Sequence, residues 1–161
     1  MEKRVLLASV IDQLRTEIAG SEASLARVRQ AAIEAPGAMQ SKSDTTKAQL
    51  SSVANQMLKL ITDKCRAVSH LVQFESQTGW EQCTTVIAGA LVDVEIDGRE
   101  GRRFLLLPDG GGMKVDDNGI SVQVLTLAAP LAVELRGRGV GEGDQISLSG
   151  RQRTFRITRI V

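Results

Sequence analysis

The chain has 161 residues and is almost neutral, because 20 basic and 19 acidic residues give a formal net charge of +1. No strongly basic surface is expected, which argues against non-specific binding to nucleic acid. The sequence has no Tyr, one Trp and three Phe, so it also lacks the aromatic platforms on which single-stranded bases stack. The length allows one ordinary domain, or a helical hairpin followed by a small domain.

The N-terminal segment MEKRVLLASVIDQ is neither a secretory signal nor a membrane span. Its apolar run is only about five residues long before Asp12. We therefore expect a cytoplasmic protein with no membrane partner. Cys65 and Cys83 have no metal-ligand spacing and no CxxC motif, so we predict that both are reduced, buried structural residues.

The first half of the chain carries two apolar stripes, separated by the Pro36-Gly37 break. In the first stripe, apolar or small residues recur at alternating steps of four and three, at Leu7, Ile11, Leu14, Ile18, Ser21, Leu25, Val28 and Ala32. The second stripe has the same rhythm at Ala54, Leu58, Ile61, Cys65, Val68 and Val72, and Leu50, Val53 and Met57 widen it. This is the spacing of a coiled-coil seam. It predicts an antiparallel hairpin of two long helices over residues 1–76, with a polar tip at about 36–47.

The second half changes from helical spacing to alternation, and nearly all the glycines occur there. The boundary lies near Ser76 to Trp80, so residues 80–161 form a second domain. Residues Thr85 to Ile96 are rich in β-branched side chains, and Asp97-Gly98 predicts a turn into a second strand. Phe74 and Trp80 sit where the two domains meet, and we expect them to form a packing cluster.

Further strands and one helix follow. Gly110-Gly111-Gly112 lacks the spacing of a phosphate-binding loop and is predicted to be a hairpin loop. Residues 120–127 alternate as a strand, and Pro130 begins a short amphipathic helix that Gly137 ends. Two final strands lie on either side of Ser149-Gly150. The second domain is therefore predicted to be α+β and mainly antiparallel, with one short helix.

The stretch from residue 120 to 161 resembles the carboxy-terminal segment of the Gre family of bacterial transcript-cleavage factors. The residues that carry the resemblance are Ile120, Ser121, Val122, Pro130, Leu131, Leu135, Gly137, Gly143 and Asp144. In that family the segment belongs to an FKBP-like domain that follows a coiled-coil hairpin. The resemblance thus implies the architecture of the whole chain.

The resemblance also implies a partner and a mechanism. Gre factors bind RNA polymerase through the globular domain and insert the hairpin into its secondary channel. Two acids at the tip then help to hold the second catalytic Mg²⁺ of the polymerase, which cleaves its own backtracked RNA. The implied protein is not itself an enzyme and has no cofactor of its own, although it would share the polymerase Mg²⁺. We expect it to be a monomer.

The tip departs from the family pattern, in which two acids are separated by two residues. Lys42 and Asp44 match the pattern, but Ser41 stands where the first acid belongs and Ser43 replaces an aromatic residue. Asp44 is then the only candidate metal ligand, and Lys42 and Lys47 make the tip net positive. We predict weak or no stimulation of RNA cleavage.

Two interpretations of the tip residues stay open. Asp44 is a functional acid, a helix N-cap or both, because Ser/Asp-Thr-Thr before an apolar stripe is also typical of a cap. Lys42 and Lys47 either contact phosphates or acidic channel walls, or belong to an ordinary solvated loop.

The docking surface for the polymerase is predicted on the helix and turn from Pro130 to Asp144. Its candidate residues are Pro130, Leu131, Glu134, Arg136, Arg138 and Asp144. Two other function classes are open. One is an adaptor like the regulators of nucleoside diphosphate kinase in the same superfamily. The other is an FKBP-like chaperone, which would need an aromatic-lined pocket that only Phe104, Phe155 and Trp80 could supply.

Overall fold

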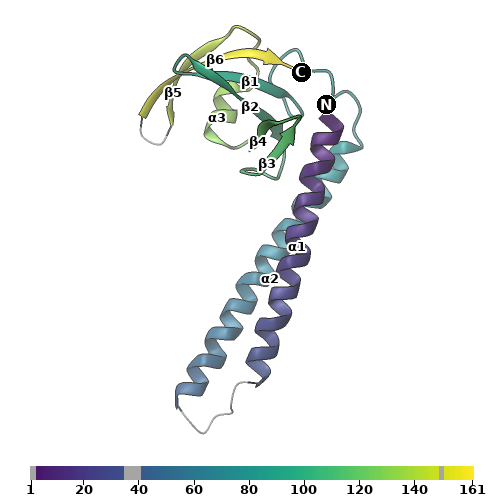
Figure 1. The fold of residues 1–161 in the computed structure, drawn as a ribbon, viewed down its shortest axis with the longest axis vertical. Helices are drawn as coiled ribbons and strands as arrows, with labels where there is room; N and C mark the ends of the chain where they lie inside the picture. The colour runs from purple at the N-terminus through teal and green to yellow at the C-terminus, as the bar shows by residue number, and fades with distance from the viewer. Residues whose placement is uncertain (1–2, 35–40, 149–150) are drawn as a thin grey trace. The chain divides into compact units, whose positions relative to one another are not determined.

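The computed structural model describes residues 3–34, 41–148 and 151–161, with backbone only for 41–45, 100, 146–148 and 151. The chain divides into two compact units. One, called here the hairpin unit, is Gln13–Val68. The other, the sheet unit, joins Met1–Asp12 to Ser69–Val161. Two long helices, α1 (Lys3–Glu34) and α2 (Ser41–Glu75), run through both units and lie antiparallel (Figure 1).

The first predicted stripe is confirmed as one side of the helix–helix seam. Its members from Leu7 to Ala32 are all buried or half-buried. In the hairpin unit, Leu25, Ala54 and Ile61 form a buried cluster, with Ile18, Val28 and Met57 packed against it. The predicted antiparallel helical hairpin is therefore present.

The second predicted stripe is confirmed at Ala54, Ile61 and Val68, which are buried or half-buried, but not at the positions between them. Leu58, Cys65 and Val72 were expected in the seam but are exposed. The seam instead uses the residue before each of them: Met57, Lys64 and Leu71. Lys64 can occupy such a position because its aliphatic stem packs while its ammonium group bonds Glu17, with Nζ 2.8 Å from Oε2. The predicted burial of Cys65 is thus wrong, whereas Cys83 is half-buried.

The sheet unit contains a six-stranded mixed sheet and one short helix. The elements are β1 (Leu91–Ile96), β2 (Arg99–Leu107), β3 (Lys114–Asp117), β4 (Ile120–Thr126), α3 (Pro130–Leu135), β5 (Gly143–Leu148) and β6 (Arg151–Ile160). The strand order is β3-β4-β2-β1-β6-β5. All neighbours are antiparallel except β2 and β4. The predicted α+β class, with a helical hairpin before a mainly antiparallel sheet, is confirmed.

The turns explain much of this topology. Asp97-Gly98 and Asn118-Gly119 all have positive φ and connect β1 to β2 and β3 to β4, as expected for two-residue hairpin turns. The loop with Gly110 is not a hairpin loop, because β2 and β3 do not pair. Gly110 has φ +81°, and an added Cβ would lie 3.1 Å from Cγ1 of Val10. This glycine therefore allows the loop to pack closely on α1.

The first strand begins at Leu91 rather than at Thr85. Gly89 interrupts the predicted strand with φ +86°, and a Cβ there would lie 2.8 Å from Cε3 of Trp80. The ring centroids of Trp80 and Phe74 are 5.2 Å apart, which confirms the predicted aromatic cluster. Buried Lys3 lies beside it and donates from Nζ to the carbonyl oxygens of Trp80 and Val161, at 3.2 and 2.8 Å.

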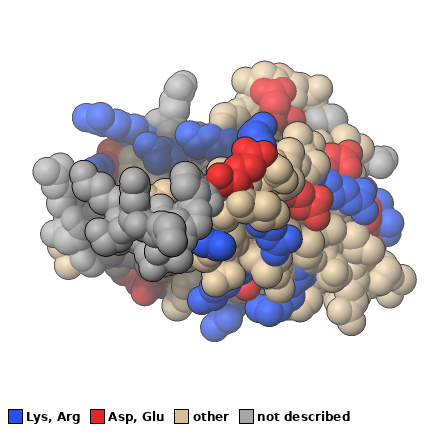
Figure 2. Space-filling model, turned by 90° about the horizontal axis from the view of Figure 1, so that it is seen from below, with Lys and Arg blue, Asp and Glu red and all other residues tan. Residues whose placement is uncertain are grey.

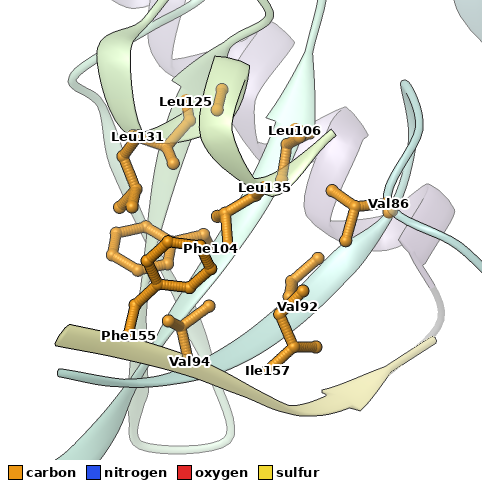
Figure 3. Close-up of a cluster of buried hydrophobic side chains, with 12 residues drawn as sticks. Val86, Val92, Val94, Phe104, Leu106, Leu125, Leu131, Leu135, Phe155 and Ile157 are labelled. Atoms are coloured by element: carbon orange, nitrogen blue, oxygen red, sulfur yellow. The ribbon is translucent and has the colours of Figure 1, made fainter. Parts of the chain in front are cut away.

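The main core lies between α3 and one face of the sheet (Figure 3). The strands contribute alternate residues, so that Val92 and Val94 of β1 share a face with Phe104 and Leu106 of β2. The remaining members are Val86, Ala90, Leu125, Leu131, Ala132, Leu135, Phe155 and Ile157. This core fixes α3 and the turn that follows it, where the docking surface was predicted.

Candidate functional site

The predicted tip, residues 36–47, is only partly within the described structure. Residues 36–40 and the side chains of Ser41, Lys42 and Asp44 lie outside it. Helix α2 begins at Ser41, so the backbone of Asp44 is already helical. A cap at Asp44 would have placed the helix start later, and the N-cap interpretation is therefore wrong. Lys47, in the second turn, is exposed.

No metal centre of the chain's own is found in the described part. Those residues include no group of three or more His, Cys, Asp or Glu side chains that could hold a metal ion. The described helices also include none long and apolar enough to cross a membrane. Any role of Asp44 in metal binding stays a prediction.

The predicted docking surface contains an ion cluster centred on Arg138. Its Nε donates to the carbonyl oxygen of Glu134 at 2.7 Å, and its Nη2 lies 3.1 Å from Oδ2 of Asp144 and 3.9 Å from Oε2 of Glu134. The guanidinium also lies over the ring of Phe155, 5.3 Å from its centroid. The backbone N–H of Gln145, and then Arg138, hold the pKa of Asp144 below its usual value. Three of the six predicted residues thus meet at the end of α3.

The other three predicted residues differ in exposure. Pro130 and Arg136 are exposed and free to contact a partner, but Leu131 is 7% exposed and packs in the core. Leu131 is therefore a core residue and not part of a surface. Sequence analysis missed Val133 and Val140, which are exposed beside the cluster. The signal was available, because a helix with Leu131, Ala132 and Leu135 buried turns its remaining apolar residue outward.

A second polar arrangement, absent from the predictions, lies on the sheet face opposite α3. Arg103 bonds both carboxylate oxygens of Asp93, at 2.7 and 3.0 Å, and Oδ2 of Asp117 at 2.9 Å. These bonds, those to Asp93 first, raise the pKa of Arg103. A pocket of about 270 Å³ opens here, with exposed Arg159 and Ile120 also in its lining. The sequence signal for this face was Asp93 and Glu95, which alternate with apolar residues along β1.

A third polar contact fastens the β1–β2 turn to β6. One carboxylate oxygen of Asp97 accepts the backbone N–H of Thr154 at 2.9 Å, and the other lies 2.7 Å from Nη1 of Arg153. The first of these bonds is the main reason that the pKa of Asp97 lies below its usual value. Both carboxylate oxygens of Asp97 therefore take part in contacts that hold the turn against β6.

No family model matches the chain, and no curated protein matches it. Three solved structures match the chain over much of its length. GreA factor homolog 1 of Thermus thermophilus is 16% identical, with 94% of each chain covered and a TM-score of 0.38. The Thermus aquaticus protein of that name is 14% identical over 92% of each chain, with a TM-score of 0.39.

A third solved structure is a GreA/GreB elongation factor from Nitrosomonas europaea. It is 19% identical, covers 60% of this chain and 78% of its own, and has a TM-score of 0.38. All three TM-scores are below 0.5 and all three identities are below 20%, so these likenesses carry no argument about the function of this chain.

Proposed function

We propose that this protein binds RNA polymerase and modulates transcription elongation by placing the hairpin tip in the secondary channel, with little or no stimulation of RNA cleavage. The observation that carries the proposal is a long antiparallel helix pair whose predicted tip has one acid where the resembled family has two. Helices α1 and α2 have 32 and 35 residues, so each is about 50 Å long at 1.5 Å per residue.

The chemistry of the tip explains why cleavage would be weak. Phosphodiester hydrolysis by two metal ions needs hard oxygen ligands that hold the second Mg²⁺ close to its octahedral geometry. Asp44 offers one carboxylate, whereas Ser41 offers a neutral hydroxyl and Lys42 adds a positive charge. A tip of this kind can occupy a channel, but it provides about half of the negative charge that a pair of acids supplies.

The sheet unit has a candidate docking surface for the polymerase at the end of α3. Arg138, Glu134 and Asp144 form a mixed-charge cluster there, and exposed Val133 and Val140 add apolar area. Apolar anchors beside polar groups are common in protein interfaces. We assign polymerase docking to this surface.

An FKBP-like chaperone is disfavoured by the position of the aromatic side chains. Phe104, Phe155 and Trp80 are 2%, 3% and 5% exposed and are packed inside the sheet unit. Within the described structure these three side chains are therefore core residues and do not form an exposed aromatic lining for a substrate proline.

The test is a backtracked-complex assay with purified protein, stalled RNA polymerase and Mg²⁺, in which binding and RNA shortening are scored together. We expect binding without shortening. Ser41→Asp should then gain cleavage, because it restores the acid pair, and Ser41→Asn is the uncharged control. Strong cleavage by the unmodified protein would overturn the non-cleaving assignment. Absence of binding would overturn the polymerase assignment as a whole.

A further inference from the structure

The hairpin unit carries a groove along the two helices that its own seam does not fill. The groove has a volume of about 300 Å³ and is lined by Glu22, Leu25, Ala26, Arg29, Leu58 and Ile61. Leu25 and Ile61 are each 6% exposed and form its floor, whereas Leu58 is 43% exposed and forms a wall. The groove therefore has an apolar interior that stays open to solvent.

The apolar pattern of α2 indicates that another helix belongs in this groove. A two-stranded coiled coil needs two apolar positions per heptad, whereas a wider stripe is typical of a helix that packs against more than one neighbour. In α2 the seam takes Met57 and Ile61, and α1 covers them. Leu58 lies one residue beyond the seam and is left uncovered. In the described structure no helix therefore covers the part of the α2 apolar stripe that contains Leu58.

The charges at the rim identify the helix that fits. Glu22 and Arg29 are seven residues apart, which is two helical turns, so they lie on the same side of α1. Within the described part of the chain, neither side chain has an ion-pair partner. If two copies of α1 meet antiparallel about a two-fold axis between Leu25 and Ala26, each Glu22 faces the partner copy's Arg29 position. A parallel pairing would instead set like charges against each other.

We infer that this groove is a self-association surface, at which two copies of the chain pair antiparallel through Glu22, Ala26, Arg29 and Leu58. The small side chain of Ala26, near the two-fold axis, allows the two α1 helices to approach closely. Leu58 of each copy gains apolar cover from its partner, and two intermolecular ion pairs fix the direction. The surface makes the protein a dimer at high concentration, in place of the monomer expected from the sequence. This inference does not depend on the proposed function, and the two states exclude each other: a dimer covers the hairpin, so only the monomer could place it in the polymerase channel.

The test measures molar mass by sedimentation equilibrium on the full chain over a wide concentration range. The 17.3 kDa chain should approach twice that mass. Glu22→Arg and Arg29→Glu should each weaken association by about tenfold, because each turns two attractive contacts into repulsive ones. A mixture of the two variants should associate more tightly than either alone, since the swapped charges are complementary again. The double variant Glu22→Arg/Arg29→Glu should recover the dimer.

Lys59→Glu is the matched control, because it changes charge on exposed α2 surface outside the groove. Leu58→Gln should weaken association while circular dichroism shows unchanged helix content. A wild-type mass that stays at one chain across all concentrations would overturn the inference. The same holds if the mixed variants associate no better than each alone. Polymerase binding by a strictly monomeric protein would leave the proposed function standing and remove only the dimer.

Discussion

The sheet unit and the hairpin unit distribute their polar and apolar groups in opposite ways. In the sheet unit, Arg103, Arg138 and Asp97 are tied to partners on neighbouring elements, and a broad apolar core lies under α3. The hairpin unit buries a narrow seam and leaves Leu58 and the charges of Glu22 and Arg29 facing outward. The comparison teaches that the polar groups of the sheet unit mainly stabilise its own fold, whereas the hairpin unit leaves apolar and charged groups exposed for contact with a partner.

The largest expected loss of stability comes from a substitution in the core of the sheet unit. Phe104→Ala should lower the free energy of unfolding by about 3–5 kcal/mol, because it empties a site where Phe104 is almost fully buried. Ile61→Ala in the narrow seam should cost about 2 kcal/mol, at the low end for such changes, because the helices can close on the space. Urea unfolding followed by Trp80 fluorescence and by circular dichroism measures both, with Val133→Ala as the exposed control. Equal costs would contradict the contrast between the units.

The next effect concerns the polar cohesion of the sheet unit. Arg103→Met should destabilise the protein by about 2–3 kcal/mol, since it removes the guanidinium that bonds Asp93 and the buried Asp117. Arg159→Met is the control, because Arg159 lines the same pocket with no ion-pair partner among the described residues. It should change stability by less than about 0.5 kcal/mol. Similar values for the two variants would show that the Arg103 network contributes little.

Two glycine substitutions, one in each unit, should change the free energy of unfolding in opposite directions. Gly89→Ala should cost about 2 kcal/mol, because its φ is +86° and its Cβ would meet Trp80. Gly20→Ala should stabilise the hairpin unit by about 0.5–1 kcal/mol, because Gly20 is helical with nothing within 4 Å of an added Cβ. Thermal unfolding of both variants checks this. A loss of stability in Gly20→Ala would show that the outer surface of α1 is more restricted than the structure indicates.

The smallest expected effect is on how the stability of the sheet unit changes at low pH. Asp97 and Asp144 both have pKa values lowered from 3.8 by hydrogen bonds and cations in the sheet unit. A lowered pKa stabilises the fold above the unfolded-state value, and this contribution is lost as the pH falls from about 4 through the folded-state value. Asp97→Asn should therefore flatten the decrease of melting temperature below pH 4. Asp116→Asn is the control, at an exposed position of β3 where the amide oxygen of Asn can still accept the backbone N–H of Gly119. Parallel pH curves for the wild type and Asp97→Asn would refute this.

Local signals made much of the fold predictable. The Asp97-Gly98 turn and the Pro130 start of α3 each depend on a few adjacent residues, and both were identified. The parallel pairing of β2 with β4 was not predicted, because it depends on β3 lying outside β4 and not on any local pattern. The seam of α2 was misplaced by one residue at Met57 and Leu58, since two adjacent apolar residues do not reveal which one faces α1.

The candidate site was predictable to a smaller extent. Charged residues near α3 pointed to the Arg138 cluster, but only the tertiary fold shows that Leu131 turns inward and Val133 outward. The Arg103 network needs the register between β1 and β2, which sets Asp93 directly opposite Arg103. Charge spacing within one strand does not contain that information.

The ion pair between Lys64 and Glu17 also helps to set the register of the two helices. It joins the two arms at a place where the seam would otherwise be apolar, and a polar contact in a seam fixes which turns of two helices lie side by side. The point on the chain equally far from both residues falls beside Ser41, where α2 begins. A slip of one heptad would break this bond and move that midpoint by half a heptad along the sequence. This ion pair near the middle of the two helices thus favours one register of the hairpin over its neighbours.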